Sequence, residues 1–177
     1  MKHVTAFILT VVLTVTGAVI TSANGGFDQE LARKINDGIS QGPDNGHFQI
    51  DAATLAQWIK EGRKDFQVID ARVGEGGKGE EVLFNKAHIP GAIYIPYHEL
   101  FKPDNLKKLD KTRTIIVACH MGATEELVIV PLRMLGYQAR ALLLGMSGWQ
   151  KDYPTQNFVR GLMDTANKGE FPVEGAK

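Results

Sequence analysis

The single cysteine of the chain, Cys119, is the side chain best suited to covalent chemistry. It follows an apolar run (114–118) that is typical of a buried strand, and it precedes a short segment containing Gly122, a residue that tolerates tight turns. Thiolates attack electrophiles, and a tight loop that directs backbone N–H groups inward stabilises a thiolate. The residue types around Cys119 therefore predict a nucleophilic sulfur in an anion-binding loop.

The place of Cys119 among the predicted elements supports this interpretation. In an open α/β sheet, ligands bind beyond the carboxyl ends of the strands, where the segment 114–118 would deliver the thiol. We expect Thr124 to cap the helix that follows, and Glu125 and Glu126 to favour the positive end of its dipole. The alternative is a buried cysteine that packs as a small apolar residue, which is the commoner case over all proteins.

Strands and helices alternate along the chain and would position this loop. Strands are predicted at 47–50, 66–72, 92–96, 113–119 and 139–144. Helices are predicted at 52–62, with Asp51 as N-cap, at 97–101, and at 125–135, with Gly136 at the C-cap position. Strands separated by helical patterns indicate parallel βαβ units, so we predict an α/β fold with a central, mostly parallel sheet flanked by helices on both faces.

The N-terminus has the pattern of a secretory signal. A basic start, an apolar run and small residues before Ala23 predict a cleaved signal peptide at 1–23 and export to a periplasm; an uncleaved membrane anchor is the alternative. Export makes a lone cysteine notable, because oxidising compartments favour paired cysteines.

Three further segments follow from the pattern. An N-terminal extension (24–46) is predicted to contain an amphipathic helix, with apolar residues every four positions from Phe27 to Ile39. The main domain covers 47–155, and a polar tail (156–177) is expected to be partly loose. Lys plus Arg and Asp plus Glu both number 20, so no overall charge predicts binding to nucleic acid or to an anionic membrane.

Four pieces of the sequence, taken in order, resemble the rhodanese-like domains. They are 68–72 (VIDAR), 87–96 (AHIPGAIYIP), 115–124 (IIVACHMGAT) and 142–149 (LLLGMSGW). The resemblance implies a sulfurtransferase or persulfide carrier without a cofactor. Cys119 would accept the sulfur as a persulfide, and the loop residues would bind it through their amides: His120, Met121, Gly122, Ala123 and Thr124.

The loop departs from the pattern of active family members, which commonly carry arginine or lysine in it. The second position is His120 and the sixth is Thr124, so the loop has no fixed positive charge. A dianion such as thiosulfate should bind poorly there, although a protonated His120 could restore charge at acidic pH. The resemblance also suggests a structural ion pair of Asp70 with Arg72; a substrate-facing Arg72 is the sharper alternative.

Several residues outside the four motif pieces have patterns that fit more than one role. His88 is expected to fix a turn by hydrogen bonding. The Gly-rich segment 73–87 is interpreted as an insertion, either a tolerated flexible loop or a lid that brings Lys78 or Lys86 to the site. The histidines show no close ligand spacing, so no metal site is predicted. Pro131 falls inside a predicted helix, which it should kink.

The leading functional hypothesis is transfer of sulfane sulfur from thiosulfate, a polysulfide or a persulfide to a thiol or cyanide. The rival class is a catalytically weak rhodanese-like module of the cell envelope that binds a partner. A cysteine phosphatase is disfavoured, because phosphatase loops need an arginine six residues after the cysteine and Glu125 stands there.

Overall fold

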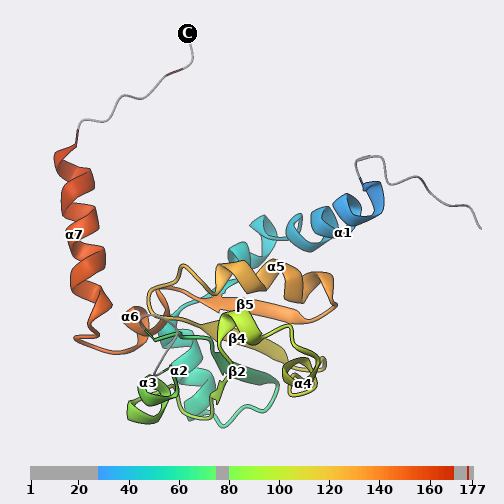
Figure 1. Ribbon diagram of the computed structural model, residues 1–177, viewed down its shortest axis with the longest axis horizontal. Coiled ribbons are helices and arrows are strands. Elements are labelled where there is room, and N and C mark those ends of the chain that lie inside the picture. Colours follow the sequence, from blue (N-terminus) through green and yellow to red (C-terminus); the bar gives the residue numbers. More distant parts are fainter. Residues whose placement is uncertain (1–27, 75–79, 170–174, 176–177) are drawn as a thin grey trace, which may run out of the picture.

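The computed structural model describes residues 28–74, 80–169 and 175, and its centre is a five-stranded parallel sheet (Figure 1). The strand order is β1-β5-β4-β2-β3, and every pair is parallel. The strands are β1 (Gln49–Ile50), β2 (Phe66–Asp70), β3 (Ile93–Tyr94), β4 (Thr114–Ala118) and β5 (Gln138–Leu142). The predicted α/β class with a parallel sheet is confirmed.

The central strand β4 is buried on both faces because helices cover both. Its residues alternate between two apolar clusters: Ile115 and Val117 belong to one, and Ile116 and Ala118 to the other. This double burial explains why the strand reads as a continuous apolar run and not as an alternating pattern. The strand therefore provides a rigid base for the loop that follows it.

Helices from different parts of the chain cover the two faces. Residues of α5 (Glu126–Met134) share the first cluster with those around η3 (Tyr97–Glu99) and α4 (Pro103–Leu106). Residues of α2 (Ala52–Lys60) and α6 (Gly145–Trp149) belong to the second. The Asp51 side chain accepts a hydrogen bond from Thr54 N at 2.8 Å, so the predicted N-cap of α2 is confirmed.

Several segments differ from the sequence prediction. The first strand is only two residues long, because η1 (Pro43–Phe48) occupies the positions before it. A helix, α3 (Glu80–Lys86), lies within the predicted insertion, while its residues 75–79 are outside the described part of the chain. The tail expected to be partly loose contains a helix of 14 residues, α7 (Thr155–Lys168).

Two amphipathic helices lie at the periphery. The N-terminal helix α1 (Gln29–Ile39) packs on the outer side of α5, and α7 projects away from the sheet (Figure 1). Both expose large apolar side chains, among them Leu31, Ile35, Phe158, Leu162 and Met163. None of the helices in the described ranges has the length and apolarity that a membrane crossing requires.

Candidate active site

Cys119 lies at the first position after β4, at the carboxyl edge of the sheet. Its side chain is buried, with 2% exposure, yet it belongs to neither of the two apolar clusters. The Gly122 N–H donates to Cys119 Sγ at 3.3 Å, and Gly122 has a φ of 98°, which side chains rarely adopt. The turn thus aims one backbone donor at the sulfur, as an anion-binding loop requires.

The start of α6 fixes the backbone of the same loop. Met146 N donates to the carbonyl of Cys119 at 2.8 Å, and Ser147 N donates to the carbonyl of His120 at 3.0 Å. A Cβ at Gly145 would lie 2.5 Å from the Cys119 carbonyl oxygen, so only glycine permits this approach. The segment 142–149 is therefore the support of the cysteine loop.

The start of α5 differs from the prediction. The helix begins at Glu126, its N-cap is Glu125, and no side chain caps it, so the expected Thr124 cap is wrong. Thr124 contributes its carbonyl, which accepts from Leu127 N at 3.3 Å. Because the chain is already helical at Glu125, with φ −63° and ψ −32°, the side chain of Glu125 turns inward.

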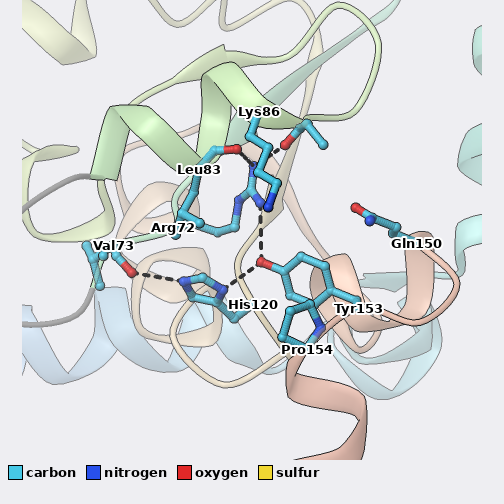
Figure 2. A pocket seen from close by; sticks show the side chains of 10 residues that line it. Arg72, Val73, Leu83, Lys86, His120, Gln150, Tyr153 and Pro154 are labelled. Carbon is cyan, nitrogen blue, oxygen red and sulfur yellow. Dashed lines mark hydrogen bonds between the residues drawn. The ribbon is translucent and has the colours of Figure 1, made fainter.

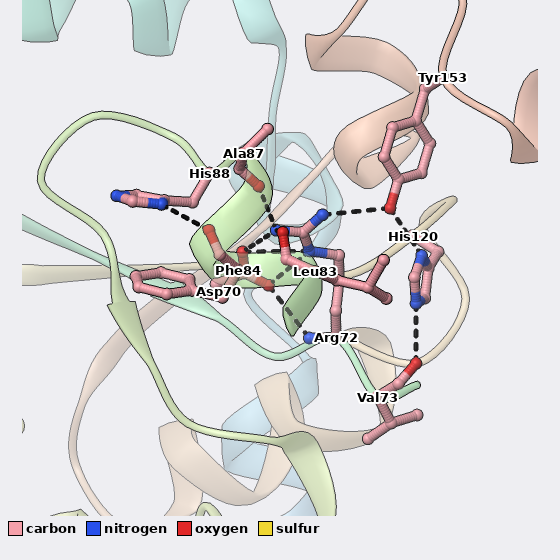
Figure 3. Close-up of polar contacts among 9 residues, drawn as sticks. All are labelled: Asp70, Arg72, Val73, Leu83, Phe84, Ala87, His88, His120 and Tyr153. Atoms are coloured by element: carbon pink, nitrogen blue, oxygen red, sulfur yellow. Dashed lines mark hydrogen bonds and ion pairs between the residues drawn. The ribbon is translucent and has the colours of Figure 1, made fainter. Parts of the chain in front are cut away.

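Asp70 and Arg72, at the end of β2, form a buried ion pair (Figure 3). Arg72 Nη2 lies 2.6 Å from Asp70 Oδ2, and both side chains are 2% exposed. The guanidinium also donates to the Ala87 carbonyl at 2.7 Å and to Tyr153 Oη at 3.2 Å. Burial lowers the pKa of Arg72, but hydrogen bonds with Asp70 and Tyr153 outweigh it and leave the pKa raised. The suggested ion pair is thus present, and the guanidinium is largely occupied by protein partners.

His120 is held between two oxygen atoms (Figure 3). Its Nε2 lies 2.9 Å from the Val73 carbonyl, and its Nδ1 lies 2.7 Å from Tyr153 Oη. A carbonyl only accepts, so Nε2 carries the hydrogen, and Nδ1 of a neutral ring accepts from the tyrosine hydroxyl. Tyr153 Oη in turn accepts from Arg72, so Arg72, Tyr153 and His120 form one chain.

A pocket of about 430 Å³ opens beside this chain (Figure 2). Arg72, His120 and Tyr153 contribute to its wall, together with Lys86 from α3 and Gln150. Cys119 is not part of the lining, whereas the neighbouring His120 is. The predicted loop residue His120 and the predicted insertion residue Lys86 are thus brought together, while Lys78 is outside the described residues.

Comparison of the chain with models of known protein families gives a match. Residues 51–152 match the model of the Rhodanese-like domain family. The chain belongs to this family. The matched region contains β2, β4, the Cys119 loop, α6 and nearly all of the pocket lining.

Several solved structures are similar to this chain. A protein from Bacillus halodurans is 27% identical with a TM-score of 0.51, over 66% of this chain and 81% of that one. A protein from Lactobacillus plantarum is 22% identical with a TM-score of 0.52, over 64% and 90%. A rhodanese-like domain protein from Staphylococcus aureus is 26% identical with a TM-score of 0.49, over 59% and 92%. No curated protein matches the chain.

The burial of Glu125 is one feature near the cysteine loop that the sequence did not indicate. Its side chain is fully buried, and no hydrogen bond from the described residues ends on either carboxyl oxygen. Burial raises the pKa of Glu125 to about 7, and an interaction with the Cys119 thiol offsets part of this effect. The sequence places both Glu125 and Glu126 at the positive end of the helix dipole, but in the structure Glu125 is buried and Glu126 is partly exposed.

Tyr153 was also missed by sequence reasoning. It lies 33 residues from His120 and 81 from Arg72, and no motif connects the three. His88, in contrast, lies outside this chain: its Nδ1 is 2.8 Å from the Phe84 carbonyl, and its ring stacks on Phe84. Within the described ranges, no three His, Cys, Asp or Glu side chains gather as a metal site would require.

Proposed function

We propose that the protein is a sulfurtransferase or persulfide carrier in which Cys119 holds the transferred sulfur. The observation that carries the proposal is the geometry of the thiol: a lone cysteine at the end of the central strand, with the Gly122 N–H aimed at its sulfur. Membership of the rhodanese-like family supports the same chemistry. This mechanism is nucleophilic catalysis through a covalent intermediate.

The reaction has two displacement steps. The Cys119 thiolate attacks the sulfane sulfur of a donor, the donor's bond to that sulfur breaks, and its electron pair leaves with sulfite or with a thiolate. An acceptor thiolate or cyanide then attacks the outer sulfur of the Cys119 persulfide and releases the Cys119 thiolate. Sulfur and electron pairs balance in both steps, so no cofactor takes part. The Gly122 N–H stabilises negative charge on Cys119 Sγ.

The pocket beside His120 is the proposed entrance for donor and acceptor. His120 belongs both to the cysteine loop and to the pocket wall, so a molecule in the pocket lies next to the loop. Lys86 supplies a positive charge there, which the loop itself lacks. An acceptor thiol that carries a carboxylate fits this charge, and Lys86→Met should raise the KM for such a thiol more than for an uncharged one.

Mass spectrometry of the intact protein tests the function directly. After incubation with a polysulfide, a small-molecule persulfide or thiosulfate, we expect a gain of one sulfur mass, which cyanide removes as thiocyanate. Cys119→Ser is the matched control, because it replaces only the sulfur atom, and it should show no gain. If no donor produces the adduct in the wild-type protein, the proposal is wrong.

A binding module is the second candidate, and the exposed apolar side chains of α1 favour it. Leu31, Ile35 and Ile39 are 46%, 38% and 45% exposed. This alternative predicts that Cys119→Ala leaves the biological role intact, whereas a polar residue at position 31 or 27 impairs it. Position 27 lies outside the described residues.

We further propose that the protein is exported, to a periplasm, after cleavage of residues 1–23. The support is the basic, apolar and small-residue pattern of this segment, which lies outside the described residues. N-terminal sequencing of the protein recovered from its native cell tests the proposal. A mature chain that starts at Asn24 is the expected result, and an intact N-terminus would indicate a membrane anchor instead.

A further inference from the structure

The backbone carbonyl of His120, in the cysteine loop, accepts hydrogen bonds from both α6 and α7. Ser147 N donates to it at 3.0 Å, and the hydroxyl oxygens of Ser147 and Thr155 lie 2.9 Å and 3.2 Å from it. The two hydroxyl oxygens are 2.5 Å apart. Each hydroxyl has one hydrogen, so one of them donates to the carbonyl while the other donates to its neighbour. The carbonyl is thus held by one backbone N–H and by this hydroxyl pair.

Thr155 connects the start of α7 to the cysteine loop. It is the first residue of α7, and it lies outside the region 51–152 that matches the family model. The next residue, Gln156, donates from Nε2 to the carbonyls of Ser147 at 2.6 Å and of Gln150 at 3.0 Å. These bonds fix the first turn of α7 against α6, so the Thr155 hydroxyl is held beside the loop.

The direction of the loop carbonyls determines where the loop N–H groups point. The Cys119 carbonyl accepts from Met146 N at 2.8 Å and the His120 carbonyl accepts from Ser147 N, so both carbonyls face α6. In a trans peptide the C=O and N–H groups point in opposite directions, and no peptide of the described ranges is cis. The N–H groups of His120 and Met121 therefore point away from α6. No described residue accepts a hydrogen bond from either of them.

N–H groups without a protein acceptor in a tight turn form a nest for an anion. In the same turn, the Gly122 N–H donates to Cys119 Sγ at 3.3 Å, so the sulfur is the atom on which this nest can act. Hydrogen bonds to a carbonyl polarise its peptide group and make the N–H of that group a stronger donor. The hydroxyl pair of Ser147 and Thr155 therefore acts on the Met121 N–H through the His120 carbonyl.

We propose that Ser147 and Thr155 are positioning residues for sulfur transfer. They hold and polarise the peptide group between His120 and Met121, so that the Met121 N–H stabilises negative charge on Cys119. This inference rests on the proposed sulfur-carrier function, in which the charge is that of the thiolate before sulfur uptake and of the persulfide after it. Both hydroxyls act through the peptide group and not on the sulfur itself.

The ultraviolet absorbance of the thiolate tests this role without any sulfur donor. Cys119 is the only cysteine of the chain, so the pH-dependent absorbance that Cys119→Ser lacks belongs to this thiolate. The double variant Ser147→Ala with Thr155→Val removes both hydroxyls and keeps the backbone N–H. We expect its absorbance midpoint to lie about 0.5 pH unit above that of the wild type, a change of about threefold in the ratio of thiolate to thiol. An unchanged midpoint would overturn the proposal.

Two single variants separate the hydroxyl contact from a general loosening of α7. Thr155→Ser keeps a hydroxyl and should keep the wild-type midpoint. Thr165→Val is the matched control, because the Thr165 hydroxyl also donates to a backbone carbonyl, that of Gly161 at 2.9 Å, but within α7 and away from the loop. It should leave the midpoint unchanged. A shift as large as that of the double variant would mean that any weakening of α7 has this effect, and would contradict the proposal.

NMR of the wild-type protein tests the direction of the Met121 N–H without relying on a variant that could fail to fold. As the thiolate forms with rising pH, the Met121 amide proton signal should move downfield with the midpoint of the thiolate absorbance, and Cys119→Ser should show no such step. A Met121 signal that does not follow the thiolate would overturn the proposal. Failure of the sulfur-mass experiment alone would contradict the sulfur-carrier function, whereas both titrations need no sulfur donor and report only on the charge at Cys119.

Discussion

Arg72 and Glu125 are two buried ionisable residues near the cysteine loop, and they differ in their hydrogen-bond partners. Arg72 is 2% exposed and donates hydrogen bonds to Asp70, Tyr153 and the backbone of Ala87. Glu125 is 0% exposed, and no described residue donates a hydrogen bond of ordinary geometry to it. The guanidinium of Arg72 is thus paired with a carboxylate, whereas no cation among the described residues pairs with the carboxyl group of Glu125.

The contrast separates structural from chemical roles. A buried ion pair with complete hydrogen bonding joins the segments that supply its partners, here the end of β2, the segment after α3 and the segment after α6. A buried carboxyl without partners does not stabilise the fold in its ionised form, and burial raises its pKa. A substrate-facing role of Arg72 stays a prediction, since its guanidinium lines the pocket while most of its donors are engaged.

Arg72→Met should produce the largest loss of stability. The substitution leaves the Asp70 carboxylate buried without its partner, and breaking a buried pair in this way costs about 3–5 kcal/mol. Unfolding by urea, followed by tryptophan fluorescence, measures the change. Arg113→Met is the control, because Arg113 pairs with Asp110 at the surface, 3.1 Å away, and should lose at most about 1 kcal/mol. Equal losses in the two variants would contradict the structural role of Arg72.

Glu125→Gln should remove a pH dependence of stability. The pKa of Glu125 is about 7 in the folded protein and 4.5 for an ordinary glutamate, so the folded state binds the extra proton between these values. The free energy of unfolding of the wild type therefore falls by up to about 3 kcal/mol as pH rises through this window, and the lower value persists above it.

The glutamine variant lacks this titration. Relative to the wild type, it should gain stability between about pH 5 and about pH 8, as measured by urea unfolding at both pH values. A constant difference between the two proteins across this range would mean that Glu125 does not titrate there. In that case, burial without a partner would not have changed the protonation of Glu125, and the contrast with the paired Arg72 would not hold.

Tyr153→Phe should lower the free energy of unfolding by less than Arg72→Met does. The phenol oxygen joins Arg72 and His120, and its removal leaves one donor of Arg72 and one ring nitrogen of His120 without this partner. We expect a loss of about 1–2 kcal/mol in urea unfolding. The His120 ring should also gain mobility, visible as NMR line broadening. An unchanged His120 signal would show that Val73 alone fixes the ring.

Glu126→Gln should have the smallest effect. Glu126 is partly exposed, and its one hydrogen bond, from Gln49 Nε2 at 3.1 Å, can also be accepted by the glutamine oxygen. Loss of the charge at the start of α5 should change the free energy of unfolding by about 0.5 kcal/mol. If Glu126→Gln changed the free energy of unfolding by several kcal/mol, as a change at a buried charged group does, burial would not explain the difference between Glu125 and Glu126.

The sequence by itself determined the α/β class with a parallel sheet and the place of Cys119 directly after a buried strand. Apolar runs such as 114–118 indicate strands buried on both faces, and Asp51 marks the start of α2 through a contact three residues away. These features depend on residues close together in the chain, which is why periodicity and capping patterns detect them. The roles assigned to the individual loop residues stay predictions.

Only the tertiary structure decided which side chains meet beside the cysteine loop. Tyr153 reaches His120 and Arg72 across 33 and 81 residues, and such meetings leave no local pattern. The two glutamates after the loop are chemically identical in the sequence, but α5 starts so that Glu125 enters the core and Glu126 does not. Burial depends on the packing of α5 against the sheet, and it raises the pKa of Glu125 to about 7.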